Sequence, residues 1–308
     1  MATTVSDPRA THPEKVKPPK EYRRRQARAN TLQGLGLLLI VLWCLFPFIW
    51  MISSSLRSGG TALTDPNILA GPFNLSNYAD VFGQQFHFAL RNTVVVAGGT
   101  TLLTIPFAAL AGYALARLGL RNRGVLLAGV LIATVFPPVA LAPPLFRAYA
   151  SINQNLGIPL IDSYPGSYFA MIVPYIALTL PLAIFIMTTF FAGIPKELEE
   201  SAKVDGASPF AAFRRVILPL AAPGVGAAAI LTFVYATNEF LLAFTFAQTN
   251  NSVRTVPVFI GNFDRVGYEN PLGQIMAASV LVSVPLILFA LVLQKRIVAG
   301  LTSGAVKG

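Results

Sequence analysis

Apolar residues in this 308-residue chain gather into long blocks that are separated by polar segments. Each block approaches the roughly 20 residues that a helix needs to cross the hydrocarbon core of a bilayer. Six blocks cover residues 32–52, 92–116, 124–148, 168–191, 222–247 and 273–294. They are too long and continuous for the strands of a barrel, and backbone amides in hydrocarbon must be paired within the protein. The pattern therefore predicts an all-α membrane protein with six transmembrane helices.

Composition agrees with this fold class. Hydrophobic residues make up 54% of the chain and charged residues only 12%, whereas soluble domains carry about 25% charged residues. The net charge of +10 is compatible either with nucleic-acid binding or with the positive-inside asymmetry of membrane proteins. The positions of the basic residues have to decide between these two classes.

The basic residues lie almost entirely on one side of the predicted spans. With the N-terminus in the cytoplasm, eighteen Lys and Arg residues fall in cytoplasmic segments. Four fall on the opposite side, at Arg57, Arg91, Arg254 and Arg265, and Arg147 lies near the outer end of the third block. We therefore expect a multi-pass protein of the plasma (inner) membrane with both termini cytoplasmic, and we expect no nucleic-acid partner.

The chain divides into two tails and a membrane domain. Residues 1–31 combine prolines with charges, which predicts a disordered basic cytoplasmic tail near anionic lipid headgroups. Residues 32–294 form the transmembrane domain, with a cytoplasmic loop at 192–221, and residues 295–308 form a C-terminal cytoplasmic tail. A cleaved signal peptide is the alternative for the N-terminus, but the apolar stretch is too long for a typical signal core. Cys44 is the only cysteine, so no internal disulfide forms.

Prolines interrupt several of the predicted spans. The third block holds the pairs Pro137-Pro138 and Pro143-Pro144, and single prolines stand at Pro106, Pro174 and Pro181. Each proline removes a backbone donor and kinks its helix. A broken helix within a membrane is tolerated where it faces protein or a water-filled cavity. We therefore expect the third block to form part of the wall of a translocation path.

One acidic residue, Glu239, lies deep within an apolar block, where a charge costs about 3 kcal/mol on insertion scales. It should face inward and have partners. Tyr235, Thr237 and Asn238 add polar groups to the same helix, so these four residues are candidates for the lining of the pathway. The alternative is that they only tie helices together by hydrogen bonds, and the sequence leaves both possibilities open.

The segment from Ile194 to Pro219 has the pattern of two short helices joined by a bend. Pro195 and the acidic residues that follow it suit the start of a helix, and Gly206 supplies a left-handed residue to end it. Ser208-Pro209 offers an N-cap and a first-turn proline for the second helix. Taken alone, this element could be an amphipathic helix in the headgroup layer.

The spacing in this segment resembles the cytoplasmic loop signature of binding-protein-dependent ABC importers. That signature is Glu-Ala-Ala, three residues, Gly, nine residues, Ile, one residue and Leu-Pro. Ser201 replaces the middle alanine and Val216 replaces the isoleucine. The signature is matched by Glu200, Ala202, Gly206, Leu218 and Pro219, and Asp205-Gly206-Ala207 is similar to the carbohydrate branch.

Other short stretches extend the resemblance over most of the chain, to the MalG-type permeases of sugar importers. They are Asn77-Tyr78, Arg91-Asn92-Thr93, Asn238-Glu239-Phe240 and the tail 300–308. The family's usual Trp before Asn-Glu is Thr237 here. The resemblance implies a MetI/MalG-like permease fold in which 195–217 is a coupling element seated in a cleft of a cytoplasmic ATPase. The residues expected in the coupling surface are Glu197, Glu200, Ser201, Ala202, Asp205, Gly206, Ala207, Leu218 and Pro219.

The resemblance also implies the partners. They are a second, MalF-type permease subunit, two cytoplasmic ATPase subunits, an extracytoplasmic solute-binding protein facing the segment from Asn250 to Pro271, and a sugar-like solute. The C-terminal tail from Leu301 is expected to contact the ATPase. ATP and Mg²⁺ belong to that ATPase, and no cofactor is expected in this chain, which contains no Gly-x-x-x-x-Gly-Lys-Ser/Thr motif.

Two other function classes need features that the spans hardly contain. An ion-coupled secondary transporter needs coupling groups inside the membrane, and Glu239 alone is thin support for one. A membrane-embedded enzyme needs converging nucleophiles or metal ligands, and the spans contain neither pattern; the two histidines, His12 and His87, are far apart. The sequence thus predicts a non-catalytic subunit of an ATP-driven importer, without identifying its solute.

Overall fold

The computed structural model describes residues 20–57, 71, 73–161, 166–248, 250–263 and 271–302. The chain divides into two units, residues 1–50 and residues 51–308. The first contains most of helix α1 (Lys20–Ser55), and residues 30–55 of this helix are long and apolar enough to cross a membrane. Residues 20–31, predicted to be disordered, already belong to the helix, because Arg, Glu, Gln and Ala are strong helix formers. Residues 1–19 lie outside the described part.

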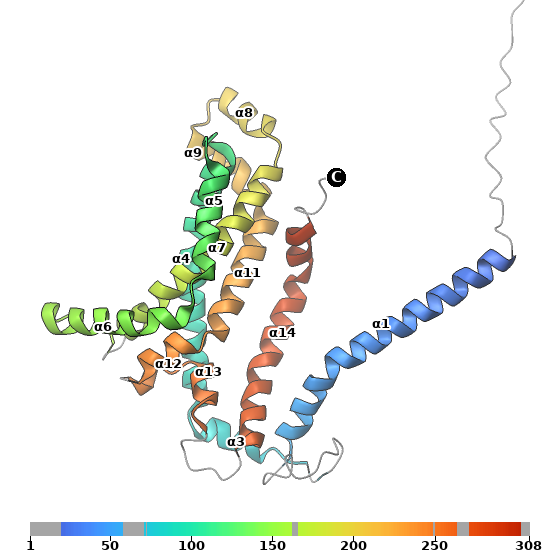
Figure 1. Cartoon of the computed structure of the whole chain (residues 1–308), viewed down its shortest axis with the longest axis vertical. Coiled ribbons are helices and arrows are strands. Elements are labelled where there is room, and N and C mark those ends of the chain that lie inside the picture. Colours follow the sequence, from blue (N-terminus) through green and yellow to red (C-terminus); the bar gives the residue numbers. More distant parts are fainter. Residues whose placement is uncertain are drawn as a thin grey trace, which may run out of the picture. The chain divides into compact units, whose positions relative to one another are not determined.

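Four long helices form the second unit's bundle. They are α4 (Phe86–Arg117), α7 (Gly166–Gly193), α11 (Ala222–Asn238) and α14 (Leu272–Thr302). Helix α4 packs along α7, and α11 contacts α4, α7 and α14 (Figure 1). Gly112 permits the close approach of α4 to α7, since a Cβ there would lie 2.8 Å from the Cβ of Met187. The predicted blocks 92–116, 168–191 and 273–294 lie within these helices.

The third block does not form one straight span. Helix α5 (Arg123–Ile132) and the 3-10 turn η1 (Ala133–Val135) end at Phe136, and α6 (Pro138–Leu156) leaves at 82° to them. Figure 1 shows α6 running across the direction of α5. Phe136 and Pro137 are extended because Pro137 disfavours helical geometry in the residue before it and donates no backbone hydrogen bond. The broken helix was expected, whereas its large bend was not.

Short helices complete the two ends of the bundle. At one end lie α3 (Ser76–Gly83), η3 (Asn251–Val253) and α13 (Val256–Ile260). At the other lie α8 (Glu197–Val204), α9 (Pro209–Ala212), the π-helical turn η2 (Phe213–Ile217) and α10 (Leu218–Leu220) (Figure 1). The fifth block breaks at Glu239 into α11 and α12 (Leu241–Ala247). α14 continues to Thr302, so the predicted tail 295–308 starts as helix, and residues 303–308 lie outside the described part.

Length and apolar composition identify the membrane-crossing elements within the described residues. Three helices satisfy both conditions, or up to five if each of two bent helix pairs is counted as one span. The second bent pair joins residues 209–220 to α11 at 76°. The predicted helical membrane fold is therefore confirmed.

Candidate functional site: a coupling element and a polar helix break

The cytoplasmic-loop candidate has the predicted form of helix, glycine bend and helix. Helix α8 ends at Val204, and Gly206 follows two residues later with a φ of +87°, in the left-handed region that glycine adopts without a Cβ clash. The backbone N–H of Ala207 donates to the carbonyl of Ala202 at 2.9 Å, which closes the bend. Ser208 then caps α9, because its hydroxyl accepts a hydrogen bond from the backbone N–H of Ala211 at 3.2 Å.

The expected coupling residues divide between an outer surface and the elbow that follows. Glu197, Glu200, Ser201, Asp205 and Gly206 are exposed, and Ala202 and Ala207 are half-buried. Leu218 and Pro219 lie in α10, immediately before the 76° bend into α11. These last two residues therefore direct the chain back into the bundle.

Exposed apolar side chains accompany these polar groups on the α8–α9 element. Val204 is 87% exposed, Phe210 is 63% exposed and Leu198 is 43% exposed. These three side chains leave apolar surface uncovered on the element.

A buried carboxylate fixes α8 to the end of α4. Glu199 is only 6% exposed, and its Oε1 accepts hydrogen bonds from the Tyr113 hydroxyl and the Lys203 Nζ, each at 2.8 Å. Its Oε2 lies 3.9 Å from the Nε of Arg117, whose Nη2 donates to the carbonyl of Ile194. Tyr113 and Arg117 are one helical turn apart on α4 and so share a face.

These contacts also set the protonation of Glu199. Burial by itself raises the pKa of the carboxyl, but the hydrogen bonds from Lys203 and Tyr113 and the charges of Lys203 and Arg117 outweigh it. The pKa of Glu199 therefore lies below its ordinary value, and the carboxylate is ionised at neutral pH. The spacing of four residues between Glu199 and Lys203 is enough to indicate their pairing on one helix. Nothing in the sequence of α8 indicates the contact of Glu199 with α4.

The second candidate site is the break between α11 and α12. Glu239 has extended backbone there, and its two carboxylate oxygens accept from the backbone N–H groups of Leu242 and Ala243 at 2.9 and 3.1 Å. The hydroxyl of the fully buried Tyr175 donates to Oε2. Glu239 therefore caps α12 and ties it to α7, so the expectation that it has partners is confirmed.

The four candidate lining residues do not share one environment. Tyr235, Asn238 and Glu239 line an open pocket of about 520 Å³ together with Pro138 and Val139 from α6. Thr237 is buried, donates to the carbonyl of Phe233 and does not line that pocket.

A second cavity shares part of its lining with this pocket. It has a volume of about 140 Å³, it shares Pro138 and Tyr235 with the first, and hydroxyl groups of three threonines interrupt its apolar lining. Those threonines are Thr134, Thr179 and Thr232. Both pockets are therefore lined by residues from the bend after α5 and from α11.

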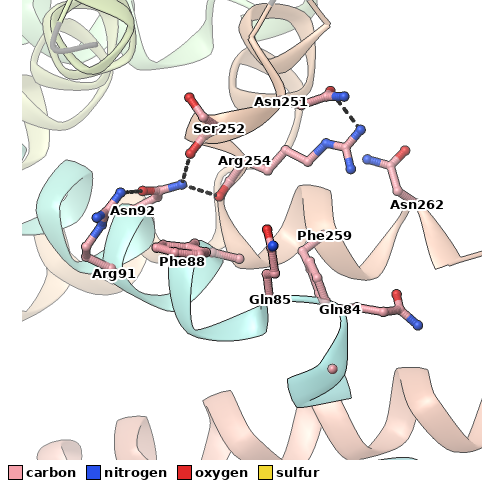
Figure 2. A pocket seen from close by; sticks show the side chains of 12 residues that line it. Gln84, Gln85, Phe88, Arg91, Asn92, Asn251, Ser252, Arg254, Phe259 and Asn262 are labelled. Carbon is pink, nitrogen blue, oxygen red and sulfur yellow. Dashed lines mark hydrogen bonds between the residues drawn. The ribbon is translucent and has the colours of Figure 1, made fainter. Parts of the chain in front are cut away.

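A polar pocket of about 660 Å³ lies at the opposite end of α4 from α8. Figure 2 shows Arg91 and Asn92 on one side of it and Asn251, Arg254 and Asn262 on another. Asn92 donates to the carbonyls of Ser252 and Arg254 at 2.8 and 2.9 Å, which holds η3 against α4.

The two stretches at this end that carried the family resemblance, Asn77-Tyr78 and Arg91-Asn92-Thr93, hold neighbouring segments together. Asn77 donates to the carbonyls of Ser55 and Arg57, both at 2.9 Å. Thr93 accepts from the backbone N–H of Val256 at 2.8 Å. Their polar groups join α3 and α4 to neighbouring segments. Within the described residues, no three His, Cys, Asp or Glu side chains come together as metal ligands.

Comparisons with known proteins place the chain in a family. Residues 104–303 match the family described as "Binding-protein-dependent transport system inner membrane component". The trehalose transport system permease protein SugB of Mycobacterium tuberculosis is 42% identical over 92% of this chain and 99% of the relative. The trehalose/maltose transport system permease protein MalG of Thermococcus litoralis is 39% identical over 92% of this chain and 99% of that relative.

A solved structure has the same fold. The crystal structure of a bacterial ABC transporter involved in the import of the acidic polysaccharide alginate contains a chain with a TM-score of 0.69 and 22% identity. The similarity covers 88% of this chain and 97% of that one. The chain belongs to the binding-protein-dependent transport system inner membrane components, and it is a permease subunit of an ABC importer.

Proposed function

We propose that this permease forms one half of the pathway for a sugar or related solute, and that α8–α9 couples it to a cytoplasmic ATPase. The observation that carries the proposal is the rigid helix–glycine bend–helix with an exposed face of Glu197, Glu200 and Val204. A short element of this kind can convert movement of a bound subunit into tilting of the helices attached to it.

The charge distribution supports a cytoplasmic location for α8–α9. Arg117, Arg121 and Arg123 cluster at the same end of α4 and α5, and Arg214 and Arg215 follow in η2. Basic residues concentrate on the cytoplasmic side of membrane proteins. That both termini are cytoplasmic stays a prediction of the charge distribution along the sequence.

The polar pocket at the far end of α4 then faces the outside, where a solute-binding protein docks. The lining combines arginines with amide side chains and contains no carboxylate among the described residues, which suits an acidic protein surface. A structural neighbour was solved in complex with an alginate pentasaccharide-bound periplasmic protein. Asp264, Arg265 and Glu269, also expected to face the binding protein, lie outside the described residues.

The sugar assignment rests on the relatives. Two are named for trehalose or for trehalose and maltose, and a third, 39% identical, is the sulfoquinovosyl glycerol permease SmoH of Agrobacterium fabrum. We propose a glycoside as the solute and a second, MalF-type permease as the other half of the pathway. Tyr235, Asn238 and Glu239 are the proposed lining residues of this half.

The proposal is tested by reconstituting the permease with the ATPase, second permease and binding protein encoded beside it. We expect ATP-dependent uptake of a sugar bound by that binding protein. Glu200→Gln should weaken retention of the ATPase subunits, and Glu200→Lys should weaken it further, because it reverses the charge on the proposed docking face. Equal retention of the ATPase by all three proteins would contradict the coupling role.

A further inference from the structure

The two adjacent acids of α8 occupy opposite environments. Glu200 is exposed, whereas Glu199 is buried against α4. We infer that Glu199 and Tyr113 form a joint that makes α8 and α4 move as one body, so that Glu199 is a positioning residue for energy coupling. This inference rests on the proposed role of α8–α9, and it assigns a function to residues outside the matched loop signature.

Tyr113 is the meeting point of four elements. Its hydroxyl binds Glu199 of α8, its ring meets Phe191 of α7 edge-on at 6.1 Å, and it meets Phe213 of η2 at 4.7 Å between ring centroids. The rings of Phe191 and Phe213 also contact each other at 6.0 Å. A displacement of α8 is therefore passed to α4 by a hydrogen bond and to α7 and η2 through packed rings.

The need for a joint follows from how α8 is attached. The helix has eight residues, a short connection from Gly193 precedes it, and the glycine bend at Gly206 follows it. A helix attached only through such connections would rotate when a partner pushed on its outer face. The Glu199–Tyr113 bond resists that rotation, and Arg117 adds a tie from α4 to the carbonyl of Ile194 in the preceding connection.

The hydrogen bond between Glu199 and Tyr113 lies in surroundings that are largely shielded from water. Glu199 and Arg117 have side chains only 8% and 3% exposed, so water competes little for their polar atoms. Hydrogen bonds to charged groups in such surroundings are stronger than neutral ones. Lys203, whose side chain is 45% exposed, contributes a more screened contact on the solvent side.

The test uses variants that remove the joint without removing the rings. Tyr113→Phe keeps both ring contacts and deletes the hydroxyl. Glu199→Ala deletes the acceptor, whereas Glu199→Gln keeps an oxygen that can accept from Tyr113. Tyr149→Phe is the matched control, because this ring also packs on a phenylalanine, Phe246, but lies on α6.

Solute uptake per ATP hydrolysed is measured in vesicles, with the amount and melting temperature of the complex measured alongside. Losing a hydrogen bond to a charged group weakens a contact by about 10- to 150-fold (about 1.5–3 kcal/mol), so we expect uptake per ATP to fall several-fold or more in Tyr113→Phe and Glu199→Ala. The double variant should be no worse than Glu199→Ala alone, because both changes remove the same bond. Glu199→Gln should recover part of the ratio, and Tyr149→Phe should match the unmodified protein.

Two results would overturn the inference. One is an unchanged uptake per ATP in Tyr113→Phe; the other is a loss in Glu199→Ala that only follows a smaller amount of assembled complex. Failure of the proposed function would instead be visible in the unmodified chain, as ATPase subunits missing from the purified complex, and it would remove the basis of the joint as well.

Discussion

Replacing Glu239 by alanine should destabilise the helix break of the fifth block. The substitution removes the acceptor for two backbone N–H groups at the start of α12 and for the hydroxyl of the fully buried Tyr175. Loss of an N-terminal cap costs about 1 kcal/mol. An orphaned buried hydroxyl costs about 1–3 kcal/mol. We therefore expect the free energy of unfolding to fall by about 2–4 kcal/mol in total.

Glu239→Gln is the informative comparison, because its amide oxygen still accepts hydrogen bonds while its NH₂ group does not. About half of the loss, roughly 1–2 kcal/mol, is expected for it. Both variants are compared by denaturant titration of the purified protein in mixed micelles, and uptake is measured in parallel. A Glu239→Ala protein as stable as the original would refute the capping role. Abolished transport in a fully stable Glu239→Gln would point instead to proton coupling.

Three further predictions follow from single positions. Gly206→Ala places a Cβ at φ +87° and should strain the bend by about 1–2 kcal/mol, which lowers ATP-driven uptake. The control Gly157→Ala, at φ +65° after α6, carries similar strain and should leave uptake intact. Equal losses of uptake in the two variants would count against a coupling role for the bend at Gly206. Gly112→Ala brings a Cβ within 2.8 Å of the Met187 Cβ and 3.0 Å of the Thr188 backbone N, so we expect the free energy of unfolding to fall by about 1–3 kcal/mol. An unchanged midpoint in the denaturant titration would contradict this close packing of α4 on α7. Because the pKa of Glu199 is lowered on folding, its contribution to stability is complete above its unfolded pKa of about 4.3 and is lost as pH falls through the lower folded pKa. Melting temperatures measured from pH 7 to 3 should therefore show an acid-dependent loss that the Glu199→Gln variant lacks. Identical pH profiles for the two proteins would exclude this contribution of Glu199.

Local chemistry explains why the α8–α9 element was predictable. The glycine at the end of α8 and the Ser-Pro start of α9 act within one or two turns of the chain, and the structure has both at the expected residues. The apolar blocks were predictable for a similar reason, because a span is defined by its own length and composition.

The features that the sequence did not predict depend on contacts between segments that are distant along the chain. The proline pair at Pro137 predicted a broken helix, but the 82° direction of α6 depends on its packing against α12. The burial of Glu199 depends on Tyr113, which lies 86 residues earlier in the chain. Glu239 was expected to have partners, yet its cap on α12 required knowing that the fifth block breaks there. Thr237 lies two residues before Glu239, near the end of α11, but is buried and does not line the pocket beside Glu239.

Photo-crosslinking from the outer face of α8 tests the central claim most directly. A photoreactive amino acid at Val204, which is 87% exposed, would be activated in membranes that contain the assembled transporter. The account predicts a crosslink to the ATPase subunit that changes in yield when ATP is added. Crosslinks to lipid alone, or to the solute-binding protein on the outer side, would contradict it.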